Sequence, residues 1–142
     1  MADTPVLTIE DANRRLPLVT AICRDVMELR ADIDLRRERL RGLRDVSVES
    51  DSEQSSLYAE EVLHAEEAIE DDEIRIDSFA AELEEIGARL ADAVKGLVEF
   101  DSELDGQPVC LSWAYGEPEV GFWRSTDETP SDRRPLILNE QT

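Results

Sequence analysis

Apolar residues recur every three or four positions along most of the first 95 residues, which is the spacing of one face of an α-helix. A first stripe runs from Ala12 to Leu43, and a second, more regular stripe runs from Tyr58 to Ala93. The segment 45–56 between them is polar, acidic and without a period, so it predicts the loop of a hairpin. The sequence therefore predicts a long antiparallel helical hairpin over residues 8–95.

Two local signals describe the beginning of this hairpin. Thr8 is suited to cap the first helix, with Asp11 three residues later as a weaker form of the capping box. Pro17 falls inside the apolar stripe, where proline removes a backbone donor and clashes with the carbonyl group four residues back. We therefore expect a kink, or a short first helix that ends near Leu16.

After Gly96 the apolar spacing changes to two, which is the spacing of a strand. Segments 97–100, 109–114 and 120–124 are typical of strands, with turns at Asp105–Gly106 and at 116–119. This pattern predicts a small antiparallel β-meander of three strands over 96–124, followed by a polar tail over 125–142. The predicted fold class is mainly α, and 142 residues suit a single domain.

The two stripes can be paired as a coiled-coil-like hairpin, because the first helix is nearly neutral and rich in arginine whereas the second is strongly acidic. Apolar residues off the second stripe, such as Leu57, Leu63 and Ile74, would stay exposed in a lone hairpin. We therefore predict a homodimer that completes a four-helix bundle.

The net charge of −20 limits the classes of partner that the protein is expected to bind. It argues against nucleic acid and against anionic membrane surfaces, because both are bound through lysine and arginine. No stretch approaches the roughly 20 apolar residues of a membrane span, and the acidic N-terminus is unlike a signal peptide. A cytoplasmic location is the resulting expectation. Cys23 and Cys110 lack metal-type spacing and are predicted to be reduced.

Carboxylates around the first predicted turn are the candidates for a metal site. The segment 101–106 reads D-x-E-x-D-G, the first half of a calcium loop, although Ser112 stands where such a loop needs a bidentate glutamate. A hairpin turn with solvated acids is the competing interpretation. The candidate ligands for a divalent cation are Glu99, Asp101, Glu103 and Asp105.

Aromatic and arginine residues of the meander are the candidates for binding a ligand, since aromatic side chains with a few polar groups commonly line binding sites. The alternative is that the aromatic rings form the core of a small sheet. His64 is the only histidine and has no partner at ligand spacing. The candidate ligand-binding residues are Trp113, Glu117, Trp123, Arg124 and Arg134.

The segments TIEDANRRLPLV (8–19), KGLVEF (95–100), LSWAYGE (111–117) and RRPL (133–136) together resemble domain-of-unknown-function family 2203. The resemblance covers nearly the whole chain and implies no known reaction, substrate or cofactor. The chain departs from the family pattern at three positions: Ser112 replaces cysteine, Arg124 replaces histidine and Glu99 replaces aspartate. If relatives use such a set for metal or nucleophilic chemistry, the resemblance implies that this member is altered in that role.

The function expected from these observations is a self-associating structural or protein-interaction module without catalysis. The alternative is a carboxylate-lined divalent-metal or small-ligand site in the C-terminal meander, which could be enzymatic. The sequence leaves open whether the protein is an enzyme, and it identifies no cofactor beyond a possible divalent cation and no partner beyond a second copy.

Overall fold

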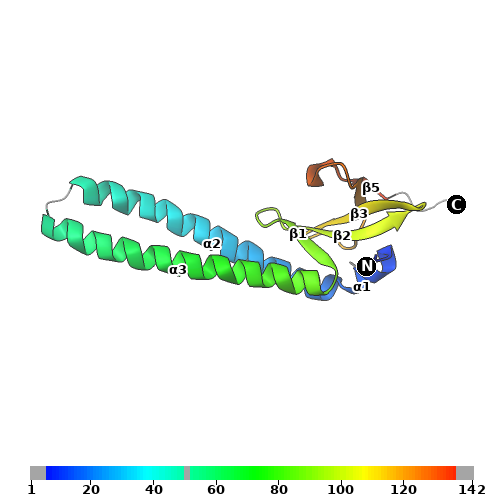
Figure 1. The fold of residues 1–142 in the computed structure, drawn as a ribbon, viewed down its shortest axis with the longest axis horizontal. Coiled ribbons are helices and arrows are strands. Elements are labelled where there is room, and N and C mark those ends of the chain that lie inside the picture. Colours follow the sequence, from blue (N-terminus) through cyan, green and yellow to red (C-terminus); the bar gives the residue numbers. More distant parts are fainter. Residues whose placement is uncertain (1–5, 50–51, 137–142) are drawn as a thin grey trace. The chain divides into compact units, whose positions relative to one another are not determined.

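The computed structural model describes residues 6–49 and 52–136 (Figure 1). Its helices are α1 (Ile9–Arg14), α2 (Leu16–Glu49) and α3 (Ser52–Glu85), with a 3-10 turn η1 at Pro130–Asp132. Its strands are β1 (Ala88–Asp92), β2 (Leu97–Leu104), β3 (Gln107–Ala114), β4 (Phe122–Ser125) and β5 (Arg134–Pro135). Among the described residues, no helix combines the length and the apolar character needed to cross a membrane.

The five strands form one antiparallel sheet in the order β1-β2-β3-β4-β5, which corrects the predicted fold class. The predicted hairpin with a small three-stranded meander is wrong, because two further strands flank the expected three. β1 lies in a segment assigned to the second helix, and β5 lies in the segment assigned to the polar tail. The sheet is therefore a major part of the fold.

Gly87 explains why the second long helix ends at Glu85, earlier than the predicted end at residue 95. The residue has a φ of +84°, a left-handed conformation that glycine adopts readily and that commonly ends helices. The backbone N–H groups of Ile86 and Gly87 donate to the carbonyl groups of Leu83 and Glu84, both at 3.1 Å, which tightens the last turn. The chain then enters β1 at Ala88 instead of continuing as helix to residue 95.

The expected signals at the start of the chain are confirmed. The Thr8 side chain accepts a hydrogen bond from the backbone of Asp11, and the Asp11 carboxylate accepts one from the backbone of Thr8. The first helix is short and ends at Arg14, and α2 begins at Leu16 with Pro17 as its second residue. Proline is tolerated there because the N–H groups of the first turn have no partner within the helix.

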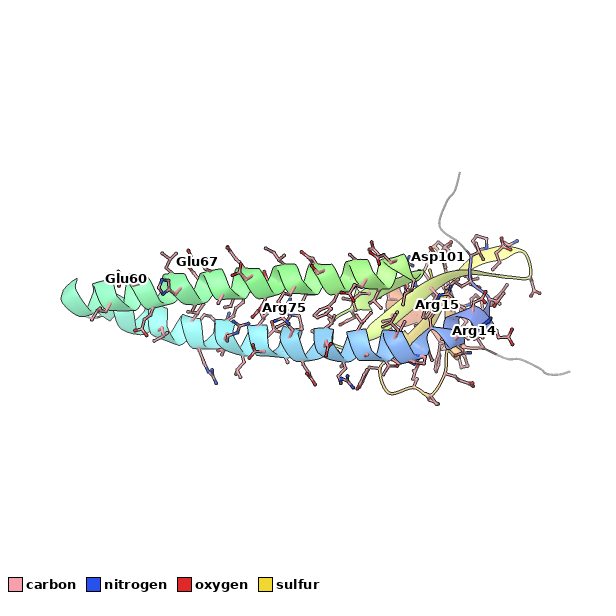
Figure 2. All side chains as sticks on the ribbon, turned by 90° about the horizontal axis from the view of Figure 1, so that it is seen from below. Arg14, Arg15, Glu60, Glu67, Arg75 and Asp101 are labelled. Atoms are coloured by element: carbon pink, nitrogen blue, oxygen red, sulfur yellow. The ribbon has the colours of Figure 1, made fainter. Side chains whose placement is uncertain are left out.

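The chain divides into two compact units, of which Glu28–Ser78 is one, and the segments up to Met27 and from Phe79 form the other. In the unit Glu28–Ser78, the helices bury Ile33, Leu40, Ile69 and Ile76. Ion pairs flank this apolar seam: Arg36 contacts Asp72 at 2.5 Å, and Arg30 and Arg37 contact Glu73. Charged side chains such as Glu60, Glu67 and Arg75 are distributed along the helices (Figure 2).

The predicted coiled coil and four-helix bundle are also wrong. The described residues form three helices, one of them only six residues long, together with the five-stranded sheet. The apolar spacing that suggested a longer helical seam continues past Glu85 into β1, where Ala88 is buried. The part of the predicted helical seam that follows Glu85 therefore belongs to the sheet.

Alternation along β2 and β3 gives the sheet two different faces. One face carries Val98, Phe100, Leu111 and Trp113, all essentially buried. The N-terminal segment is tied to the same strands, because the Leu7 N–H donates to the Asp101 carbonyl and the Ser102 hydroxyl donates to the Leu7 carbonyl. The other face is polar and holds ion pairs. The Asp105–Gly106 turn is confirmed, with positive φ at both residues as in a type I′ hairpin.

Candidate functional site

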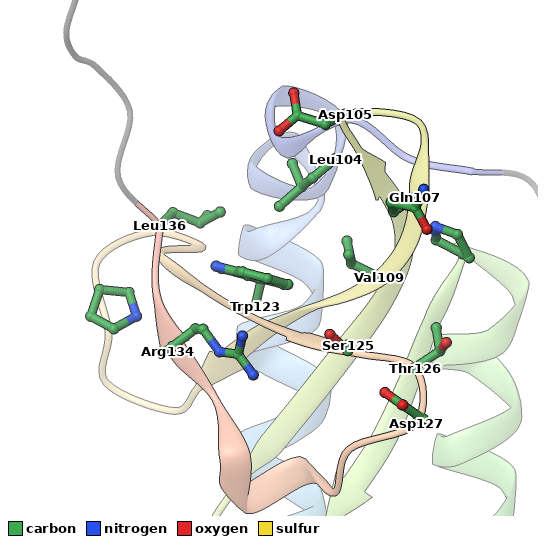
Figure 3. A pocket seen from close by; sticks show the side chains of 12 residues that line it. Leu104, Asp105, Gln107, Val109, Trp123, Ser125, Thr126, Asp127, Arg134 and Leu136 are labelled. Carbon is green, nitrogen blue, oxygen red and sulfur yellow. The ribbon is translucent and has the colours of Figure 1, made fainter.

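A hollow of about 1100 Å³ opens beside the β2–β3 hairpin (Figure 3). The end of the hairpin, β4 with the residues after it, and β5 bound this space. Its volume lies slightly above the roughly 300–1,000 Å³ that is typical of small-molecule pockets. The side chains that line it are Leu104, Asp105, Gln107, Pro108, Val109, Trp123, Ser125, Thr126, Asp127, Arg134, Pro135 and Leu136.

The wall of the hollow is mostly apolar, and Trp123 on β4 is its largest side chain. The strand register places Trp123 opposite Leu111 on one side and opposite Arg134 on the other. The Arg134 guanidinium lies 4.5 Å from the centroid of the indole ring and also pairs with Glu128. These contacts hold the ring in place, because a cation over an aromatic face is attracted by the ring's electrons.

The indole nitrogen of Trp123 makes no hydrogen bond within residues 6–49 and 52–136, although the side chain is only partly exposed. Trp113 is different, since its Nε1 donates to the Glu117 carbonyl at 2.9 Å. A tryptophan N–H normally finds a partner when the ring is buried. The Trp123 donor therefore has no partner among the described residues.

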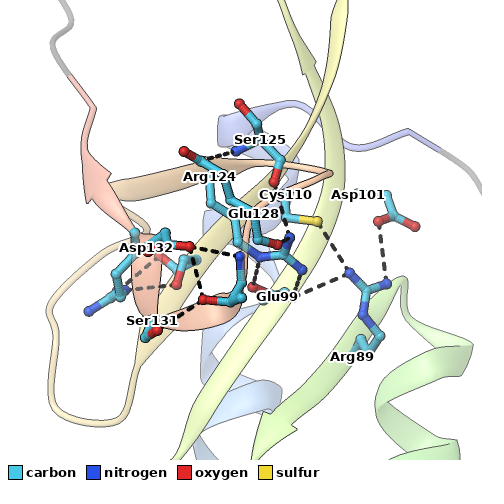
Figure 4. A network of polar contacts seen from close by, with 12 residues as sticks. Arg89, Glu99, Asp101, Cys110, Arg124, Ser125, Glu128, Ser131 and Asp132 are labelled. Atoms are coloured by element: carbon cyan, nitrogen blue, oxygen red, sulfur yellow. Dashed lines mark hydrogen bonds and ion pairs between the residues drawn. The ribbon is translucent and has the colours of Figure 1, made fainter.

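The opposite face of the sheet holds a buried ion pair between Glu99 and Arg124 (Figure 4). Nε and Nη2 of Arg124 donate to the two carboxylate oxygens of Glu99 at 2.6 and 2.8 Å, and the Glu99 side chain is 1% exposed. Hydrogen bonds to Glu99 raise the pKa of the Arg124 guanidinium above its ordinary value. Nη1 of Arg124 donates to the Glu128 carbonyl at 2.5 Å, so the pair also fastens the segment after β4.

Arg89 extends this network to Cys110 and Asp101 (Figure 4). Its guanidinium contacts the Cys110 sulfur at 3.4 Å, Asp101 at 3.3 Å and Glu99 at 3.4 Å. Burial, and secondarily the Glu99 charge, raise the pKa of the Cys110 thiol. Since the thiolate is the reactive form of cysteine, Cys110 has the character of a buried structural thiol.

Arg133 builds a second polar cluster on this face. It contacts both carboxylate oxygens of Glu117 at 2.8 Å and donates to the Ser112 hydroxyl at 2.8 Å. Its guanidinium carbon also lies 4.1 Å from the centroid of the Phe122 ring. The sequence patterns did not single out Arg133, and a cationic residue in a polar segment carries no signal of such a contact.

Lowering the pH is expected to weaken this second cluster. Burial raises the pKa of Glu117, but hydrogen bonds from Arg133 and from the Ala114 N–H outweigh burial and leave it below the ordinary value of 4.5. The folded protein therefore binds this proton less tightly than the unfolded chain does, so the stabilisation is complete above the unfolded pKa and is lost as the pH falls through the lower folded pKa.

Urea unfolding at a series of pH values measures this loss. The Glu117→Gln variant should show a smaller fall in the free energy of unfolding than the parent between about pH 5 and pH 3. Asp71→Asn, at an exposed carboxylate on α3, is the matched control and should follow the parent. Identical pH profiles for Glu117→Gln and the parent would contradict the assignment.

The structure separates the predicted ligand-binding residues into four places. Trp123 and Arg134 line the hollow, together with Asp105 from the predicted metal set. Arg124 is buried against Glu99, and Glu117 is paired with Arg133. Trp113 is 1% exposed in the core, at an edge-on angle to Tyr115. These five residues therefore do not form a single site.

The predicted metal ligands are also dispersed. Glu99 and Asp101 contact arginines, Glu103 is exposed, and Asp105 lies in the hairpin turn. Across the described segments, no three histidine, cysteine, aspartate or glutamate side chains gather as metal ligands would. The divalent-cation site stays a prediction.

The three positions at which the chain departs from the resembled pattern lie together on the polar face. Glu99 is the register partner of Ser112 and forms an ion pair with Arg124.

The sequence patterns did not indicate several residues that line the hollow, among them Leu104, Val109 and Asp127. Alternation could have placed Val109 on the face of Trp113, but only the pairing of β3 with β4 adds Trp123 to that face.

Comparison with protein families gives one match over most of the chain. The family described as "Uncharacterized conserved protein (DUF2203)" matches residues 6–136, which include both helical arms and all five strands. No curated protein and no solved structure matches the chain.

Proposed function

The chain belongs to the DUF2203 family, whose function is uncharacterised, and from this premise we propose that its C-terminal sheet is a binding domain for a small molecule with an apolar body. The observation that carries the proposal is the hollow of about 1100 Å³ beside Trp123. Half of the residues that line it are apolar and half are polar or charged, and a site that combines apolar surface with polar groups can bind a small molecule and orient it.

The apolar wall supports the class of molecule. Val109 is 4% exposed and Leu104 is partly buried, so the base of the hollow continues from the packed core of the sheet. Pro135 and Leu136 close another side. A ligand that removes such surface from water gains about 25 cal/mol per Å² of apolar area, before the costs of association are subtracted.

Trp123 supports specificity as well as affinity. Its ring is oriented by the cross-strand Arg134, so little conformational freedom is lost when a ligand binds against it. Its free indole N–H offers one hydrogen bond to an acceptor such as a hydroxyl or carbonyl oxygen. Arg134 is in turn held by Glu128, which makes the arrangement preorganised.

Binding of 4-phenylbutan-1-ol, an uncharged probe with an aromatic ring and one hydroxyl, tests the proposal. Isothermal titration calorimetry should detect binding to the parent protein and a dissociation constant raised at least about tenfold in Trp123→Ala, which corresponds to about 1.4 kcal/mol. Tryptophan fluorescence should change on binding in the parent and not in Trp123→Phe, because Trp113 lies in the core.

Tyr115→Ala is the matched control, since Tyr115 is an exposed aromatic residue of the same chain that does not line the hollow. This variant should bind the probe as the parent does. Failure of the parent to bind, or an equal loss in both alanine variants, would contradict the proposal.

The homodimer and the structural or interaction role stay predictions. Leu63 and Ile74 on α3 are 53% and 61% exposed, and their separation of eleven residues puts them on one helix face about three turns apart. This surface is the part of the hairpin that supports self-association.

A further inference from the structure

We infer that the hollow selects organic cations: molecules that join an amine or ammonium group to an apolar or aromatic body. The inference rests on the proposed function, because it assigns the charge of the ligand that the same hollow takes. It is carried by the distribution of charge around the wall and by the aromatic ring within it.

Two carboxylates on the wall have no partner. Asp105 and Asp127 both line the hollow, and neither makes a hydrogen bond or an ion pair with the described part of the chain. Asp105 is held at the hairpin turn with a φ of +52°, and Asp127 follows the end of β4 (Figure 3). Two carboxylates from different segments therefore line one space, and neither is paired with a cation of the described residues.

The positive charge in the hollow is already matched. Arg134 is the one cationic residue among the described side chains that line it, and its guanidinium pairs with Glu128 and lies over Trp123. An anionic ligand would have to compete with Glu128 for this group and would meet Asp105 and Asp127. A cationic ligand meets two carboxylates that lose no existing partner when they turn toward it.

Trp123 favours the same sign of charge. The face of an indole ring is electron-rich and attracts ammonium groups, by about 0.5–1 kcal/mol at exposed sites and more when water is excluded. The net charge of −20 adds a long-range field that concentrates cations near the protein at low ionic strength. The local carboxylates, the indole ring and the field of the whole protein therefore all favour a cationic ligand.

Three probes with one skeleton test the inference: 4-phenylbutan-1-amine, 4-phenylbutan-1-ol and 4-phenylbutanoate. At neutral pH they carry positive, zero and negative charge on the same phenylbutyl body, so the order of their affinities reports the sign of charge that the hollow prefers. The amine should bind about threefold to tenfold more tightly than the alcohol at low salt, and the butanoate more weakly than the alcohol. Raising the salt should reduce these differences, because exposed charges are screened.

Variants that neutralise the two carboxylates show whether these residues cause the preference for the amine. The Asp105→Asn and Asp127→Asn double variant should lose the preference, so that it binds the amine about as tightly as it binds the alcohol. Asparagine tolerates positive φ, so the hairpin turn is preserved. The matched control is Asp71→Asn with Asp77→Asn, at exposed carboxylates of α3, which makes the same change in net charge and should keep the preference.

The outcomes separate this inference from the proposed function. If none of the three probes binds, the proposed function fails and the inference fails with it. If the alcohol binds but the amine is no tighter, or the butanoate is tightest, the hollow is a ligand site and selection for cations is overturned. An amine preference that survives in the Asp105 and Asp127 double variant would overturn the assignment to these carboxylates.

Discussion

Replacing Arg124 with methionine is expected to lower the free energy of unfolding by about 3–5 kcal/mol, the range seen when one partner of a buried ion pair is removed. Methionine fills much of the same space but offers no donor to Glu99. The Glu99 carboxylate, 1% exposed, would keep only Arg89 at 3.4 Å in place of two short hydrogen bonds from Arg124. Urea unfolding followed by circular dichroism measures the change.

Two further variants show whether the buried charge is the cause. Arg134→Met removes a more exposed arginine on the neighbouring strand and should cost less than about 1.5 kcal/mol. The double variant Glu99→Leu with Arg124→Met replaces the pair by apolar groups and should recover a large part of the loss, because no charge is left unpaired. A loss in Arg124→Met no larger than in Arg134→Met would contradict the assigned role of the pair.

The Gly96→Ala variant is expected to lower the free energy of unfolding by about 2–5 kcal/mol. Gly96 has a φ of +71°, where a residue with a Cβ loses about 1–2 kcal/mol. An added Cβ would lie 2.5 Å from the Met27 sulfur and 2.8 Å from the Tyr115 Cβ. Forcing these groups apart adds about 1–3 kcal/mol of overpacking. Thermal and urea unfolding both measure the effect.

Substitutions at two other glycines separate the cost of the backbone conformation from the cost of overpacking. Gly106 also has a positive φ, at +78°, but an added Cβ would meet nothing within 4 Å, so Gly106→Ala should lose only about 1–2 kcal/mol. Gly42 lies within α2 with open space around it, and Gly42→Ala should stabilise the protein by up to about 1 kcal/mol. Equal losses of unfolding free energy in Gly96→Ala and Gly106→Ala would show that the close approach to Met27 does not affect stability.

Much of the local structure could be predicted because it depends on neighbouring residues. The capping box at Thr8, the break before Pro17 and the turn at Asp105–Gly106 each follow from chemistry within a few positions. The strand β1 could not be recognised in the same way. Leu90 and Ala93 continue the three-to-four spacing of α3, and only the left-handed Gly87 shows that the helix has already ended.

The candidate site depends on pairings between segments that lie apart in the sequence. Composition pointed to Trp113, Trp123 and Arg134, but it could not show that one tryptophan is in the core and the other in the hollow. That difference follows from the register, which places Trp123 between Leu111 and Arg134. Asp127 carries no signal of its own, since acidic residues are common throughout this chain.

The attachment of Leu7 to β2 has a consequence for the order of folding. The hydrogen bond between Leu7 and Ser102 spans 95 residues, whereas successive strands of the sheet are joined by short local connections. Contacts that close long loops form late, because the entropy of closure is lost before the contact is gained. On the ribosome, Leu7 and α1 emerge long before their partner strand. Leu7 is therefore expected to be among the last of the described residues to acquire protection against hydrogen exchange.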